Sequence, residues 1–144
     1  MIDFLIIFLA DWLIYFLAFG VLVYCITTRS KVLFRQCLTT VSMTWFIGWI
    51  IKNLFYFPRP FILTGRTPLA GLPLDGTFPS NHTVIAFSLA FPFLLSHRKG
   101  GLVVLMMAFL VALGRILGGV HTAVDITAGI LISALVSRIV HRWG

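Results

Sequence analysis

Five long apolar runs restrict this chain more than any other feature of its sequence. A bilayer core is about 30 Å thick and takes about 20 helical residues to cross. Apolar runs near that length, separated by charge, glycine or proline, lie at residues 2–26, 38–57, 82–96, 101–117 and 121–140. The third is the shortest and contains Pro92, which predicts a kink. We therefore expect an all-α fold, a single polytopic membrane domain over residues 1–144 with about five transmembrane helices.

Charge is too scarce for a soluble domain. Charged residues make up 10% of the chain, against about 25% in ordinary soluble domains, and the mean hydropathy is +1.05. Disorder, a disulfide scaffold and a coiled coil need charge, cysteine or heptads that this sequence lacks. Cys25 and Cys37 lack metal-ligand spacing, so we expect apolar packing and no metal site. The first run is too long for a signal peptide and begins with Asp3, so we expect it to be retained.

The basic residues divide unevenly between the two sides that five helices define. Seven fall on one side, and the positive-inside rule makes that side cytoplasmic. They are Arg29, Lys31, Arg35, Arg98, Lys99, Arg138 and Arg142. We therefore expect a protein of the inner (cytoplasmic) membrane with its N-terminus outside, its C-terminus inside and residues 58–80 in an outward loop. The sequence has no extended basic face, so we expect lipid and no nucleic acid as partner.

Polar residues that a membrane chain normally avoids gather at the outward helix ends. They occupy the segments 52–60, 79–82 and 114–125. In the second segment Ser80 follows a proline and precedes an apolar run, which is typical of a helix N-cap. The amides of Asn81 and His82 would then lie at the positive end of a helix dipole, where they favour an anion.

His121 and Asp125 are spaced four residues apart at the start of the fifth run. On one helical face this spacing brings the two side chains within reach of each other. The carboxylate can then fix the imidazole tautomer and stabilise the positive charge that appears when the other ring nitrogen attacks an electrophile. The pair therefore indicates a candidate nucleophile.

Three further cations, Lys52, Arg59 and Arg115, lie near the same helix start. Together with the helix dipole they indicate a ligand with about two negative charges, and arginine binds phosphate oxygens through its planar fork. His82 is placed to give a proton to the oxygen that leaves when a bond to phosphorus breaks. The segments therefore predict a phosphate site.

These motifs resemble the signature of the type 2 phosphatidic acid phosphatase family of membrane lipid phosphatases. The three parts are Lys52-x6-Arg59-Pro60, Pro79-Ser80-x-His82 and Arg115-x5-His121-x3-Asp125, which together cover residues 52–125. The resemblance implies a phosphohistidine on His121, oriented by Asp125, with His82 as general acid. It implies no metal or other cofactor. It implies phosphate ligands at Lys52, Arg59, Ser80 and Arg115, with the backbone of Asn81 beside the phosphate.

The sequence departs from this family's pattern in three ways. Asn81 stands where the family usually has glycine, and Gly114 stands where it usually has serine. Typical members have six helices, whereas five are expected here. Asparagine tolerates a left-handed backbone, so we expect the turn at residue 81 to survive. We expect an activity that is retained but weaker or differently specific.

The resemblance and the outward site together predict an integral-membrane lipid phosphatase. Undecaprenyl diphosphate, a carrier lipid released outside the cell, is the substrate we expect. Phosphatidylglycerophosphate, phosphatidic acid and lipid A phosphate are the alternatives. A phosphotransferase would pass the same phosphoryl group to another acceptor, and a non-catalytic lipid-binding subunit would keep the cations alone. The composition excludes a soluble haloperoxidase, and the oligomeric state is left open.

Three charged residues outside the motifs need their own explanation. Asp11 lies about nine residues into the first run, roughly 14 Å from its start at 1.5 Å per residue. A carboxylate at that depth should find a partner in the bundle or handle a headgroup or a proton. Arg66 and Asp75 lie on the outward loop, where we expect solvated charges or residues that select the headgroup.

Overall fold

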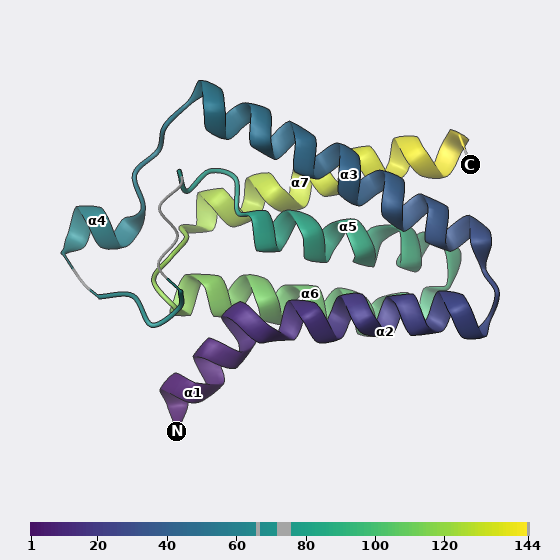
Figure 1. The fold of residues 1–144 in the computed structure, drawn as a ribbon, viewed down its shortest axis with the longest axis horizontal. Helices are drawn as coiled ribbons and strands as arrows, with labels where there is room; N and C mark the ends of the chain where they lie inside the picture. The colour runs from purple at the N-terminus through teal and green to yellow at the C-terminus, as the bar shows by residue number, and fades with distance from the viewer. Residues whose placement is uncertain (66, 72–75, 144) are drawn as a thin grey trace.

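The computed structural model describes residues 1–65, 67–71 and 76–143, and the long elements in this part of the chain are helices (Figure 1). The first apolar run forms α1 (Ile2–Ile7), a π-helical turn η1 (Phe8–Trp12) and α2 (Leu13–Thr27). The others form α3 (Lys31–Leu54), α5 (Asn81–Ser96), α6 (Arg98–Leu117) and α7 (Ala123–Trp143). A short α4 (Pro60–Thr64) follows α3.

Within the part of the chain that the structure describes, three helical segments are long and apolar enough to cross a membrane. They are Ile2–Thr27, Lys99–Leu117 and Ala123–Trp143, and α5 is a shorter apolar helix. The predicted all-α membrane bundle is therefore confirmed, while a crossing by all five helices stays a prediction. The termini lie at opposite ends of the bundle, as an odd number of antiparallel helices requires (Figure 1).

Several predicted boundaries were wrong. The second run was expected to be helical over 38–57, but α3 begins at Lys31 and ends at Leu54. Phe55 is already extended, with φ −133° and ψ 115°. The residue before a proline is pushed out of the helical region, and Pro58 and Pro60 make this segment unsuited to a helix until Pro60 starts α4. The last helix begins at Ala123, so His121 precedes it.

The helix α5, which has 16 residues, lies at the centre of the bundle (Figure 1). It packs against α2, α3, α6 and α7. Ala86, Phe87 and Ala90 are fully buried on it, and Pro92 lies within a helix that continues to Ser96. Neighbouring helices therefore shield α5 from lipid, which explains why a helix shorter than a bilayer span suffices here.

Hydroxyl groups join three helices in the apolar interior. The Oγ atoms of Thr44 on α3 and Ser88 on α5 lie 2.8 Å apart, and Ser88 Oγ donates to Ser133 Oγ on α7 at 3.2 Å. Ser133 Oγ in turn donates to the carbonyl of Val84 at 3.0 Å. Such contacts hold helices together where lipid removes the hydrophobic drive for association. They set the register that brings the polar ends of α3, α5 and α7 to one level.

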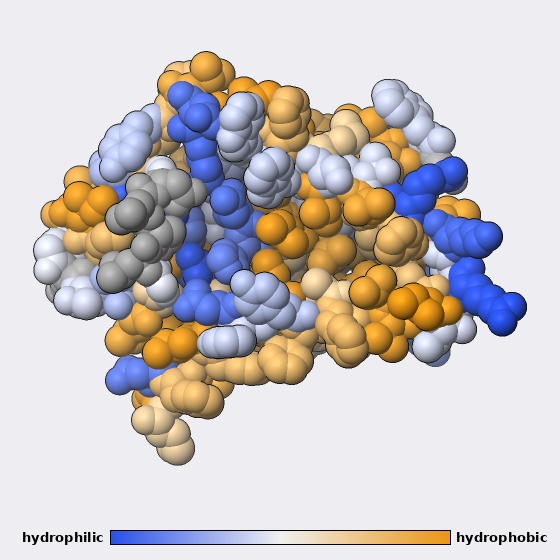
Figure 2. Space-filling view, in the orientation of Figure 1, coloured by the Kyte–Doolittle hydropathy of each residue, from blue (hydrophilic) through white to orange (hydrophobic). Residues whose placement is uncertain are grey.

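Polar side chains gather towards the two ends of the long axis, with apolar side chains between them (Figure 2). One end carries α4 and the start of α5 and α7 (Figure 1). The other end carries the α2–α3 and α5–α6 connections and the C-terminus, where the sequence places the basic residues predicted to be cytoplasmic. This distribution suits a bilayer around the middle of the bundle.

Candidate active site

The motif residues converge at the end of the bundle that carries α4. Lys52 lies in the last turn of α3, Arg59 immediately precedes α4, and the side chain of Ser80 caps α5. The backbone N–H of Ser80 donates to the carbonyl of Asp125 at 3.3 Å, which joins the starts of α5 and α7. The predicted convergence of three sequence segments at one helix end therefore agrees with the structure.

A local hydrogen-bond pair starts α7 and orients Asp125. The backbone N–H of Thr122 donates to Asp125 Oδ2 at 2.6 Å, and the N–H of Asp125 donates to Thr122 Oγ1 at 3.3 Å. This reciprocal pattern is a capping box, in which two otherwise unpaired amides are satisfied. Asp125 therefore stabilises the helix start and at the same time lies beside His121.

Thr77 bridges His121 and Asp125. Nδ1 of His121 lies 3.6 Å from Asp125 Oδ2, which is too long for a good hydrogen bond. Thr77 Oγ1 donates to Asp125 Oδ2 at 2.8 Å and lies 3.1 Å from His121 Nδ1. The two side chains therefore lie within reach of each other, as their spacing predicted, but His121 precedes α7 and the hydroxyl of Thr77 joins them.

The bridge determines the tautomer of His121. An ionised carboxylate only accepts hydrogen bonds, so the single proton of Thr77 is used on Asp125. Thr77 Oγ1 must then accept from Nδ1–H, which leaves Nε2 without a proton. Arg59 Nη1 lies 3.4 Å from Nε2, and a guanidinium only donates. Both neighbours therefore favour the tautomer whose Nε2 lone pair can act as a nucleophile.

Arg59 and Lys52 meet at one carbonyl beside this imidazole. Arg59 is 3% exposed and also donates from Nη1 to the Val120 carbonyl at 3.1 Å. Its Nη2 donates to the Gly76 carbonyl at 3.5 Å, and Lys52 Nζ donates to the same oxygen. Two of the three predicted cations thus lie together next to the candidate nucleophile.

The start of α5 has the predicted cap. Ser80 is fully buried, and its Oγ accepts from the N–H of Thr83 at 3.5 Å and from Thr83 Oγ1 at 3.1 Å. The backbone N–H groups of Asn81 and His82 lie in the first turn of α5. No carbonyl within the helix can accept a hydrogen bond from them. Both residues are half-buried, and Asn81 lines a cavity of about 520 Å³ together with Lys52 and Gly76.

The third predicted cation has a different partner. Arg115 lies in the last turn of α6 and is 3% exposed. Its Nη1 forms an ion pair with Asp11 Oδ1 and donates to the Ala10 carbonyl at 3.4 Å. The partner expected for Asp11 in the bundle is therefore this arginine. Arg66 and Asp75 lie outside the described residues.

Electrostatics keep His121 neutral. Burial, together with the charges of Arg115 and Arg59 and against the opposing effect of Asp125, lowers the pKa of His121 from 6.5 to about 4. At neutral pH the imidazole therefore carries a lone pair. Among the described residues, no group of three or more His, Cys, Asp and Glu side chains could hold a metal ion.

We expect ¹⁵N NMR of histidine-labelled protein to show His121 as the neutral Nδ1–H tautomer at pH 7, still neutral at pH 5.5. The unfolded chain accepts this proton near pH 6.5, whereas the folded state resists it down to about pH 4. The residue should therefore make the fold less stable as the pH falls between those values. An imidazolium signal already at pH 6.5, or an Nε2–H tautomer, would contradict this assignment.

Sequence reasoning missed Thr77 and the partner of Arg115. Thr77 comes from the outward loop, 44 positions before His121, and no spacing rule connects the two residues. The fold of the outward loop places Thr77 beside His121. There the backbone N–H of Thr77 donates to the Phe57 carbonyl at 2.9 Å. The depth of Asp11 in an apolar run was a usable signal, because it required a partner without saying which one.

Comparisons with family models and with known proteins agree on the family of this chain. The family model of the PAP2 superfamily matches residues 11–144. Bacitracin transport permease protein BcrC of Bacillus licheniformis is 35% identical over 131 residues, which cover 89% of this chain and 64% of that protein. Putative undecaprenyl-diphosphatase YbjG of Escherichia coli (strain K12) is 29% identical over 105 residues, covering 72% of this chain and 53% of that protein. The chain thus spans less than two thirds of either relative.

A solved structure shares the whole arrangement of helices. The crystal structure of Aquifex aeolicus LpxE has a TM-score of 0.82 and 26% sequence identity to this chain. The match covers 98% of this chain and 86% of that one. The similarity therefore includes the first helix as well as the helices that carry the motifs.

Proposed function

Since the chain belongs to the PAP2 superfamily of membrane proteins, we propose that it hydrolyses a lipid phosphate or diphosphate through a phosphohistidine on His121. The observation that carries the proposal is the buried imidazole of His121, whose Nδ1 is occupied by Thr77 while Nε2 faces Arg59 at 3.4 Å. A neutral nucleophile beside a fixed cation suits attack on an anionic phosphorus, because the cation neutralises the charge that repels a nucleophile.

The proposed reaction has two steps. Nε2 of His121 attacks the terminal phosphorus, and the bond from phosphorus to the bridging oxygen breaks with its electron pair leaving on the oxygen. His82, in its imidazolium form beside the bound phosphate dianion, gives its proton to that oxygen and becomes neutral, and the shorter lipid product departs. Water then attacks the phosphohistidine and gives a proton to His82, which releases inorganic phosphate and restores His121.

The other site residues support these steps. Asp125, acting through Thr77, stabilises the positive charge on the imidazole during attack. Lys52, Arg59 and Arg115 bind the phosphate oxygens, and the amides at Asn81 and His82 behind the Ser80 cap add the positive end of a helix dipole. The residues present supply a nucleophile, a proton donor and counter-charges, so the scheme uses no metal.

Undecaprenyl diphosphate is the substrate we propose, at the outer face of the cytoplasmic membrane. The name of YbjG specifies an undecaprenyl-diphosphatase, and the seven basic residues at the opposite end favour an outward site. Phosphatidylglycerophosphate, phosphatidic acid and lipid A phosphate share the same end group and are the alternatives to be compared. Transfer to another acceptor in place of water would show as a phosphorylated product.

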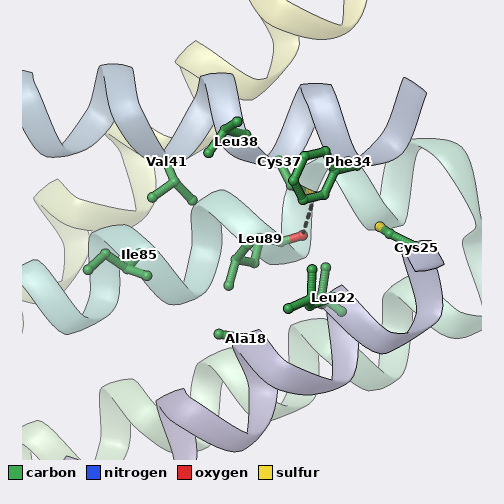
Figure 3. Close-up of a pocket in the computed structure, with 10 residues that line it drawn as sticks. Ala18, Leu22, Cys25, Phe34, Cys37, Leu38, Val41, Ile85 and Leu89 are labelled. Atoms are coloured by element: carbon green, nitrogen blue, oxygen red, sulfur yellow. Dashed lines mark hydrogen bonds between the residues drawn. The ribbon is translucent and has the colours of Figure 1, made fainter. Parts of the chain in front are cut away.

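An apolar groove supports a substrate with a long hydrocarbon tail. It lies between α2, α3 and α5 and has a volume of about 210 Å³ (Figure 3). Ile85, three positions after His82 on α5, lies near one end of the groove, while Cys25 and Phe34 lie towards the other. A tail that follows this groove would run from the phosphate site along the bundle, shielded from water.

Phosphate release in detergent tests the proposed function. Purified protein should release phosphate from undecaprenyl diphosphate faster than from phosphatidic acid or phosphatidylglycerophosphate, and EDTA should leave the rate unchanged. Thin-layer chromatography of the lipid product separates hydrolysis from transfer. Release from none of the lipids, or a requirement for a divalent ion, would overturn the proposal.

The groove predicts a dependence on tail length. Ala18→Phe should narrow it and lower kcat/KM for undecaprenyl diphosphate about tenfold, since overpacking costs about 1–3 kcal/mol, while farnesyl diphosphate is hydrolysed almost unchanged. Gly20→Phe is the matched control, because it adds the same ring to α2 where nothing lies within 4 Å. An equal loss for both substrates would show that the groove does not hold the tail.

A further inference from the structure

The first helix contacts the phosphate site through Asp11. Asp11 Oδ1 lies 2.5 Å from Arg115 Nη1, and Oδ2 accepts from the backbone N–H of Gly71 at 3.1 Å. The side chain is 27% exposed, whereas that of Arg115 is 3% exposed. One carboxylate therefore joins the first helix, the outward loop and a buried cation of the site.

A local change in helix geometry accompanies this contact. Asp11 lies in η1, where the α-helical hydrogen bonding of the first helix is replaced by a π-helical turn. Such turns are rare and are frequently found at functional sites. The Ala10 carbonyl of the same turn accepts from Arg115 Nη1 at 3.4 Å. Two consecutive residues of η1 thus contact the same nitrogen.

Gly114 allows the backbone of η1 to come this close. A Cβ atom at position 114 would lie 2.6 Å from the nitrogen of Ala10 and 2.6 Å from the carbonyl carbon of Leu9. Both are backbone atoms, so they could not move aside as a flexible side chain does. Any side chain at position 114 would push η1 away from α6 and carry Asp11 away from Arg115.

The η1 turn also contacts Val120, the residue before the proposed nucleophile His121. Ala10, Ala70 and Val120 are buried together in a small cluster, and Val120 immediately precedes His121. The N–H groups of Leu69 and Ala70 donate to the Gly118 carbonyl at 3.0 and 3.3 Å, which holds the loop on the α6–α7 connection. The η1 turn therefore packs directly behind the site.

We propose that Asp11 is a positioning residue that holds the guanidinium of Arg115 in the orientation required to bind the phosphoryl group, and that Gly114 makes this contact possible. The inference rests on the proposed function. A guanidinium is a rigid planar fork, so a carboxylate that fixes one amino group fixes the direction of all its N–H bonds. The guanidinium of Arg115 is then already oriented before substrate binds. No free energy is spent on orienting it during the reaction.

Kinetic coupling tests the proposal. Asp11→Ala and Gly114→Ala should each lower kcat on the order of 10–10²-fold, since a displacement of about 1 Å at such a group costs up to about 10²-fold. Asp11→Asn keeps an oxygen acceptor and should recover most of this loss. Gly20→Ala, where nothing lies within 4 Å of the added atom, should match the wild type.

The double variant separates positioning from a merely structural role. In an Arg115→Ala background, Asp11→Ala should lower kcat no further, because the group that it positions is gone. A structural role would instead reduce the active fraction by the same factor in both backgrounds, and that result would overturn the proposal. An Asp11→Ala variant within twofold of the wild type would overturn it too.

A second readout does not depend on hydrolysis. The ¹⁵Nη resonances of Arg115, assigned by their loss in Arg115→Lys, should be separate in the wild type and in Asp11→Asn, because rotation of the guanidinium is hindered. They should merge in Asp11→Ala and Gly114→Ala. A single averaged signal in the wild type would refute the positioning role, whereas separate signals in a protein without phosphatase activity would leave it standing and overturn only the proposed function.

Discussion

His121→Ala is expected to lower kcat for undecaprenyl diphosphate by about 10⁴- to 10⁶-fold, the loss typical of removing a covalent nucleophile. Arg59 and the helix start remain in this variant and still stabilise the phosphoryl group, but no imidazole nucleophile is left to form the covalent intermediate. Because Nε2 of His121 acts in the chemical step of the proposed reaction, the loss should appear in kcat more than in KM. Stopped assays of phosphate release measure it.

A histidine at the opposite end of the bundle gives the matched control. His141 is exposed near the C-terminus of α7, and His141→Ala should leave kcat within about twofold of the wild type. Thermal unfolding in detergent checks that His121→Ala remains folded, since His121 is only 4% exposed. A folded His121→Ala variant that keeps more than a tenth of the wild-type rate would exclude His121 as nucleophile.

Asp125→Asn is expected to lower kcat by roughly 10³- to 10⁴-fold, as loss of the orienting carboxylate does in other His–Asp pairs. The amide oxygen of asparagine can still accept from Thr77 and from the Thr122 N–H, so the cap of α7 should survive. What disappears is the negative charge that stabilises the imidazolium during attack. Melting temperatures close to the wild type should therefore accompany the loss of activity.

Thr77→Val tests the contribution of the Thr77 hydroxyl separately from that of the Asp125 negative charge. It keeps Asp125 ionised but removes the hydroxyl that holds Nδ1 at 3.1 Å, so we expect a smaller loss on the order of 10–10²-fold. Thr127→Val on α7 is the control, because its exposed hydroxyl donates to the Ala123 carbonyl of its own helix, away from His121 and Asp125. A Thr77→Val variant as active as this control would mean that Asp125 orients His121 without the bridge.

The helices could be predicted from the sequence because lipid imposes a simple rule. A chain in hydrocarbon must satisfy its backbone within each segment, so apolar runs of the right length become helices. The start of α3 at Lys31 was missed, because hydropathy marks where a helix enters apolar surroundings and not where its hydrogen bonding begins. Helix ends in water are set by caps and prolines, such as Pro60 at the start of α4.

Features of the site that depend on residues close together in the sequence could be predicted. Ser80 was identified as a cap because capping is local, and the structure confirms it. Thr77 and the Asp11–Arg115 pair were not predictable, because each joins positions far apart in sequence. Their proximity depends on how the outward loop and the η1 turn pack, and no pattern of residue types encodes that packing. The side of the membrane that the site faces likewise remains a prediction from charge.

Trapping of the covalent intermediate tests the central claim most directly. Undecaprenyl diphosphate labelled with ³²P on its terminal phosphate is mixed with excess protein and quenched in alkali within milliseconds. We expect label bound to the wild-type chain, stable to alkali and released by acid as a phosphohistidine requires, and mapped to a peptide that contains His121. Rapid hydrolysis with no label on the protein, or label that persists in His121→Ala, would contradict the account.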